Sequence, residues 1–114
     1  MDGHYHHPDD RKFGAHLRRA AGSEFAAFVT FNEAVGRDDG AVPLKYRELI
    51  SVAVALTTQC AYCIDTHTKN ARANGASKQE IAEAGFVAAA VRAGGTLAHS
   101  LMALRIFDEE EKAG

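Results

Sequence analysis

Apolar residues recur every three or four positions through most of this chain, and no run of five or six residues alternates apolar with polar side chains. The first pattern is typical of helices that bury one face, whereas a half-buried β-strand requires the second. Proline, which interrupts helices, occurs only at Pro8 and Pro43. The sequence therefore predicts an all-α fold without a sheet.

Capping residues and helix breakers predict about six helices in one domain. Ser23 is placed to cap a second helix where a first one weakens at Gly22, and Ser77 with Glu80 has the spacing of a capping box. Two adjacent glycines, Gly94 and Gly95, are expected to separate the last two helices. The helices are expected over roughly residues 13–21, 24–36, 43–56, 59–74, 78–93 and 97–107.

Length and charge restrict the class of protein. The 114 residues suit a single domain, which we expect over residues 11–114 after a polar tail over residues 1–10. A net charge of −2 without a basic block argues against nucleic-acid binding.

The longest uncharged stretch, Leu49 to Ile64, is too short to cross a bilayer, and no secretory signal is visible. We therefore expect no membrane association and a cytoplasmic location. His4, His6 and His7 are expected to be solvated in the tail rather than to bind a metal.

Two cysteines and a histidine carry the chemistry. On a helix, Cys60 and Cys63 share one face, and His67 lies one turn beyond Cys63 on that face. Cys60 falls near the expected start of its helix, where unpaired N–H groups and the helix dipole favour a thiolate. A dithiol–disulfide cycle is therefore available, with His67 as a base or proton relay toward Cys63.

Glu48 joins this group only if the chain folds back on itself. On one straight helix Glu48 would lie about 18 Å from Cys60, since each residue adds 1.5 Å. Thr57 and Thr58 are poor residues for a helix interior and good N-caps, so they predict a break between two helices. A fold back at this break would bring the Glu48 carboxylate toward His67.

These residues carry a resemblance to a known family. Arg47, Glu48 and Leu49 are followed by small and apolar residues, then by Q-C-A-Y-C-I-D-T-H-T and later by A-R-A-N-G-A-S. This arrangement, over roughly Pro43 to Gly95, resembles the core of the carboxymuconolactone decarboxylase and alkylhydroperoxidase D superfamily. The resemblance implies an AhpD-like helical domain that assembles into homo-oligomers, commonly trimers or hexamers.

The resemblance also implies an activity and roles for the site residues. The activity would be that of an alkylhydroperoxidase-like oxidoreductase that reduces peroxides or disulfides, with a thiol reductant or redox protein as electron donor and with neither metal nor cofactor. Cys63 would attack the peroxide, Cys60 would resolve it, and Glu48 with His67 would relay protons. The dipole argument instead favours Cys60 as the more acidic thiol. Alkylhydroperoxidase D has a histidine where this chain has Tyr62, a phenol that does not titrate near neutral pH.

Other interpretations remain open at this point. The fold can serve a lyase that acts on a small organic acid lactone, with the thiols incidental. Cys60, Cys63 and His67 can supply three zinc ligands, with Glu48 or His99 as a fourth, in a structural or redox-sensing module without enzyme activity. The cysteines can also be small buried apolar residues, and Glu48 can pair on the helix surface with Lys45 or Arg47.

Overall fold

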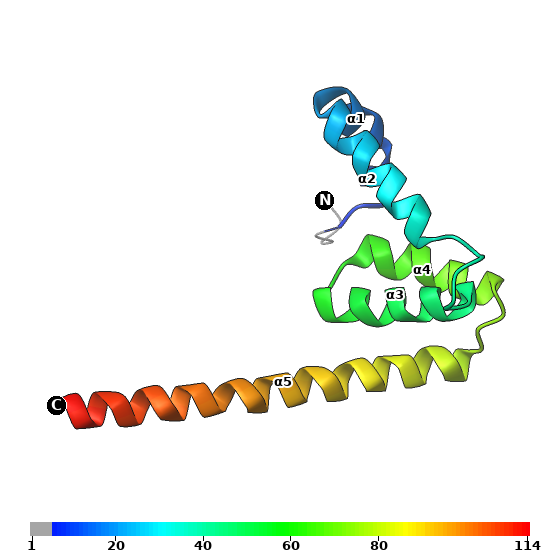
Figure 1. Cartoon of the computed structure of the whole chain (residues 1–114). Coiled ribbons are helices and arrows are strands. Elements are labelled where there is room, and N and C mark those ends of the chain that lie inside the picture. The colour runs from blue at the N-terminus through cyan, green and yellow to red at the C-terminus, as the bar shows by residue number, and fades with distance from the viewer. Residues whose placement is uncertain (1–5) are drawn as a thin grey trace.

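The computed structural model describes residues 6–114, and within that range it contains helices and no strand (Figure 1). The all-α expectation is confirmed. The elements are the 3-10 helix η1 (Pro8–Phe13) and the α-helices α1 (Gly14–Ala20), α2 (Gly22–Val35), α3 (Leu44–Thr58), α4 (Ala61–Ala73) and α5 (Lys78–Ala113).

Helix α3 is the centre of the packing. It contacts both α4 and the first part of α5, whereas α1 and α2 pair with each other and stand apart from these helices (Figure 1). The buried apolar side chains are Val52 and Ala55 of α3 and Ala71 of α4. The other apolar residues of α3 are not all covered, since Ile50 and Val54 are each more than half exposed. Burial on two sides of α3 therefore positions the α3–α4 connection, where the cysteines lie.

Local signals place most helix ends where the sequence predicts them. Pro43 is the N-cap of α3, so this helix begins at Leu44. Gly75 takes a positive φ of 93° just after α4, a conformation that glycine adopts at little cost. At the start of α5 the Ser77 hydroxyl accepts the Glu80 N–H at 3.0 Å, and the Glu80 carboxylate accepts the Ser77 N–H at 2.9 Å. The predicted capping box is therefore formed.

Two predicted helix ends are wrong. Ser23 does not cap α2, because the N-cap lies two residues earlier, at Ala21, and Ser23 is in the first turn of the helix. Gly94 and Gly95 do not break the last helix either, and α5 runs through both of them for 36 residues. A glycine inside a helix costs only about 1 kcal/mol, and no proline follows these two. Thr96, a residue type that can cap a new helix, instead donates its hydroxyl to the Arg92 carbonyl at 3.1 Å, so the helix continues through it. A single long helix thus replaces the two that were predicted.

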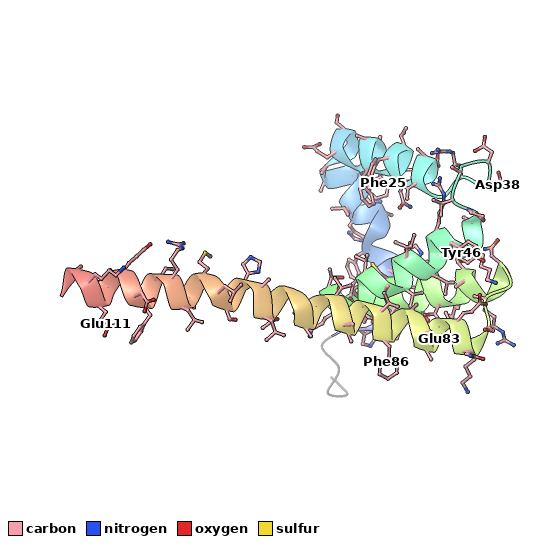
Figure 2. The ribbon with its side chains drawn as sticks, turned by 60° about the horizontal axis from the view of Figure 1, so that its bottom comes forward. Phe25, Asp38, Tyr46, Glu83, Phe86 and Glu111 are labelled. Carbon is pink, nitrogen blue, oxygen red and sulfur yellow. The ribbon has the colours of Figure 1, made fainter. Side chains whose placement is uncertain are left out.

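The second half of α5 projects beyond the rest of the chain (Figure 1). Every residue from Val91 onward is exposed, although many are large and apolar. Phe86, which Figure 2 shows directed away from the other helices, is 78% exposed. The exposed large apolar residues of this helix are Phe86, Val87, Val91, Leu97, Leu101, Met102, Leu104, Ile106 and Phe107.

By length and composition alone, α5 also meets the criterion for a helix that can cross a membrane. Core helices of soluble proteins that meet the same criterion are mostly buried, whereas none of the apolar stretch of α5 is buried among the described residues. This segment is not an uncharged stretch of the sequence, because Arg92 and Arg105 interrupt it. The expectation of no membrane association thus stays a prediction.

The capping box provides a test of how α5 is held at its start. Ser77→Ala removes the hydroxyl that accepts the Glu80 N–H, and we expect it to lower the free energy of unfolding by about 1 kcal/mol. Chemical denaturation followed by circular dichroism measures this change. Ser100→Ala is the matched control, because the Ser100 hydroxyl bonds only to the Leu97 carbonyl in the exposed part of the same helix. Equal stability losses for the two variants would contradict a role for the cap.

Candidate functional site

The site begins at the sharp connection between α3 and α4. Thr57 and Thr58 belong to the last turn of α3, where their hydroxyls donate to the Val54 carbonyl at 2.8 and 3.0 Å. The predicted break is therefore present, but neither threonine caps the next helix. Gln59 adopts a left-handed conformation with a φ of 56°, and Cys60 is the N-cap of α4. A single left-handed residue reverses the chain and brings α4 back along α3.

Cys60 and Cys63 face each other across the first turn of α4. Their Sγ atoms lie 2.6 Å apart and form a hydrogen bond, and both thiols are free and half-buried. The Cys60 Sγ also accepts the backbone N–H of Cys63 at 3.3 Å. Cys60 therefore acts as the N-cap with its sulfur, which is the position where a helix best stabilises a negative charge.

The two thiols differ in acidity. The hydrogen bond from Cys63, followed by the backbone N–H of Cys63, lowers the pKa of the Cys60 thiol. The same sulfur–sulfur hydrogen bond, with burial as the next cause, raises the pKa of the Cys63 thiol. When the pair loses its first proton, the charge therefore resides on Cys60, as the position of Cys60 in the first turn predicts.

Glu48 and His67 form a contact between α3 and α4. The Glu48 Oε2 lies 2.6 Å from the His67 Nδ1, and the glutamate is only 8% exposed. The alternative ion pairs do not occur: Lys45 pairs with Glu80 at 2.8 Å, and Arg47 donates to backbone carbonyls. A carboxylate on Nδ1 orients the imidazole and leaves Nε2 as the nitrogen that can exchange a proton with a ligand.

A cavity of about 270 Å³ connects the histidine and one of the cysteines. Cys63 and His67 both line it, whereas Cys60 does not. Its remaining wall comes from α3 and is mainly apolar. A water molecule in the liquid occupies roughly 30 Å³, so the cavity has room for a small organic molecule. The lining residues are Ile50, Ser51, Val54, Ala55, Thr58, Cys63 and His67.

The N-terminal segment adds contacts that the sequence did not predict. The Tyr62 hydroxyl donates to the Asp10 carboxylate, and the Arg11 guanidinium donates to the Tyr62 carbonyl at 2.8 Å. His6 packs edge-on against the Tyr62 ring, and His7 caps η1, so these two histidines are not simply solvated. His4 lies outside the described residues. No local pattern marks Asp10 or Arg11, because their partners lie about fifty positions away.

The described residues do not form a zinc site. Among residues 6–114, no three His, Cys, Asp or Glu side chains converge closely enough to hold a metal ion. His99, considered as a fourth ligand, lies on the exposed part of α5, and its Nδ1 is 3.0 Å from the Gly95 carbonyl oxygen. The structure thus brings Glu48 to His67 and Cys60 to Cys63, and it leaves His99 apart from them.

Comparison with known proteins identifies the family. The model of the carboxymuconolactone decarboxylase family matches residues 23–105. "Uncharacterized protein 4 in cox locus" of Paracoccus denitrificans is 44% identical over 95 residues, which cover 83% of this chain and 85% of the relative. An uncharacterized protein of Cupriavidus necator is 31% identical over 99 residues, which cover 87% and 86% of the two chains. The resemblance drawn from the cysteine motif is confirmed, and the chain belongs to the carboxymuconolactone decarboxylase family.

Proposed function

We propose that the protein is a thiol-dependent reductase of peroxides or disulfides that works through Cys60 and Cys63, with His67 and Glu48 as a proton relay. One observation carries the proposal: Cys63 and His67 line the same small cavity while Cys60 contacts Cys63 from outside it. A substrate in the cavity would meet one thiol and one base, with a second thiol within reach of the first.

The acidities of the thiols suit a division of roles. Cys63, whose pKa is raised, needs a base to become a nucleophile, and His67 is the base in the same cavity. The Cys63 thiolate would attack a peroxide oxygen, so that the O–O bond breaks, Cys63 becomes a sulfenic acid, and the alkoxide leaves as an alcohol with the proton that His67 had taken. The apolar wall favours an organic hydroperoxide as the substrate.

The second step uses the more acidic thiol. The Cys60 thiolate attacks the Cys63 sulfur, the S–O bond breaks, and hydroxide leaves as water with the proton that Cys60 gave up. The dithiol is thereby oxidised by two electrons, and the peroxide is reduced to alcohol and water. A thiol reductant or a redox protein then restores the dithiol. We place this cycle in the cytoplasm, where thiols are kept reduced.

The direct test is the intact mass and free-thiol count of the reduced protein, before and after one equivalent of an organic hydroperoxide. We expect a mass loss of two hydrogens and the loss of both thiols, reversed by a dithiol reductant. Metal analysis runs on the same sample. Two unreactive thiols together with turnover of a small lactone would contradict the proposal and favour the lyase, whereas two unreactive thiols with stoichiometric zinc would favour a metal-bound module.

The relay predicts a specific loss in a His67 variant. His67→Ala should slow the alkylation of Cys63 by iodoacetamide at neutral pH several-fold, because no base then removes the thiol proton. The rate is measured with Cys60→Ser in the background, so that only Cys63 reacts. His67→Asn can keep a donor toward Glu48 without supplying a base, and it should be slow as well. His99→Ala is the control. Equal rates of Cys63 alkylation in all variants would contradict a proton relay through His67.

We also propose that α5 associates with further copies of the chain. Its second half carries large apolar side chains that residues 6–114 leave exposed, and exposed apolar patches of this kind mark interaction surfaces. Within residues 6–114 the only buried apolar residues are Val52, Ala55 and Ala71. A core this small buries little apolar surface in one subunit, and contact between subunits would bury more. Trimers or hexamers are the assemblies that the family resemblance implies.

A further inference from the structure

The N-terminal 3-10 helix lies against the turn that carries the two cysteines, and Arg11 makes three contacts there. Its Nη2 donates to the Tyr62 carbonyl at 2.8 Å and to the Thr66 hydroxyl at 3.1 Å, and its Nη1 lies 3.0 Å from the Asp65 carboxylate. A guanidinium can make these contacts at once because its donors diverge in one plane. Arg11 therefore fixes two turns of α4 from outside.

The N-terminal 3-10 helix makes a second connection to Tyr62, which lies between the two cysteines. The Tyr62 hydroxyl donates to the Asp10 carboxylate, which also accepts the backbone N–H of His7. Both ends of Tyr62, its carbonyl and its hydroxyl, are thus held by η1. Because Tyr62 stands directly before Cys63, movement of this residue would alter the distance between the two sulfurs.

We propose that Arg11 is a positioning residue of the thiol site, which holds the Cys60–Cys63 turn and places a permanent positive charge beside it. The role rests on the proposed function of the cysteine pair.

The electrostatics of the pair support this role. The sulfur–sulfur hydrogen bond has the largest effect, and it lowers the pKa of Cys60 while raising that of Cys63. The charge of Arg11 instead lowers the pKa of both thiols. The first interaction decides which sulfur is charged, whereas Arg11 favours ionisation of the pair as a whole. The other titratable groups around this turn are His6, His7 and Asp10 of the N-terminal segment, Glu48 of α3, and Tyr62, Asp65, His67 and Lys69 of α4.

The test measures the ionisation of the thiols without any peroxide. The fully reduced protein is alkylated with iodoacetamide over a range of pH, and the modified cysteines are identified by peptide mass. In Arg11→Gln we expect the profile to move to higher pH and the rate at neutral pH to fall roughly three- to tenfold, which is the change that half a pKa unit to one unit produces. Arg11→Lys keeps the charge and should recover part of the rate. Arg105→Gln, which removes an exposed arginine of α5 paired only with Glu109, should match the parent.

A purely structural Arg11 would behave differently. In that case Arg11→Gln would lower the melting temperature while its alkylation profile overlaid that of the parent, and the proposal would be overturned. A shift of equal size in Arg105→Gln would overturn it as well. Because no peroxide is used, a shifted profile would stand even if the thiols proved inert toward peroxides, and an unshifted profile would leave peroxide reduction by the pair intact.

Discussion

Cys63→Ser is expected to abolish the proposed reduction of organic hydroperoxides, with a loss of at least about a hundredfold, because it removes the proposed nucleophile from the cavity that His67 also lines. Cys60→Ser should retain the first step and lose the second. In this variant Cys63 would stop at the sulfenic acid, which a dimedone adduct traps and mass spectrometry locates. Peroxide consumption in the presence of a thiol reductant measures the turnover of each variant.

The same pair of variants decides between the two thiols. The lowered pKa of Cys60 makes it the more acidic sulfur, whereas its partner is the one that faces the cavity. The contrary result would be a rapidly formed sulfenic acid on Cys60 in Cys63→Ser and none on Cys63 in Cys60→Ser. The lower pKa of Cys60 would then matter more than the position of Cys63 in the cavity wall, and the assigned roles would be reversed. If neither variant lost turnover, the thiols would have no part in the activity.

Charges on the exposed face of α5 are expected to dissociate the proposed homo-oligomer. Leu97 and Leu101 lie one turn apart on this helix and are 69% and 66% exposed in the subunit. Each leucine gains about 1.5–3 kcal/mol when it is fully buried, so replacing both with lysine removes this gain and introduces charges that an apolar interface excludes. The parent should elute as an oligomer and Leu97→Lys/Leu101→Lys as a monomer, with molar mass determined by light scattering.

The control introduces two lysines at the polar end of the same helix without removing an apolar side chain. Glu110→Lys/Glu111→Lys alters the polar end of α5 and should keep the parent's molar mass. A monomeric parent would contradict self-association, and so would an unchanged mass in the double leucine variant. Binding of the parent to neutral phospholipid vesicles, lost in the same variant, would instead assign the apolar face of α5 to a membrane.

Local patterns predicted much of the fold because their causes are local. The capping box of Ser77 and Glu80 needs only residues three apart, and the positive φ of Gly75 needs only a residue without a side chain. Gly94 and Gly95 show the limit of this reasoning. Their modest helix penalty does not outweigh a hydrogen-bond ladder that continues on both sides of them.

The candidate site was predictable only in part. The spacing of Cys60, Cys63 and His67 placed them on one helical face, and the break after Thr58 made an approach of Glu48 geometrically possible. The contact at 2.6 Å between Glu48 and His67 required the left-handed turn at Gln59, which no capping pattern in the sequence indicated. The cavity required the packing of α3 on α4, because residues of both helices line it.

The sequence by itself determined the helical class, most of the helix ends and the family, since these depend on the spacing of residues and on motifs within a short stretch of chain. Tertiary structure alone decided that Arg11 and Asp10 hold the residue between the cysteines, that Cys63 rather than Cys60 faces the cavity, and that the second half of α5 is left uncovered. These features join groups far apart in the chain. Their energies depend on distance and burial in the folded molecule, which local spacing does not encode.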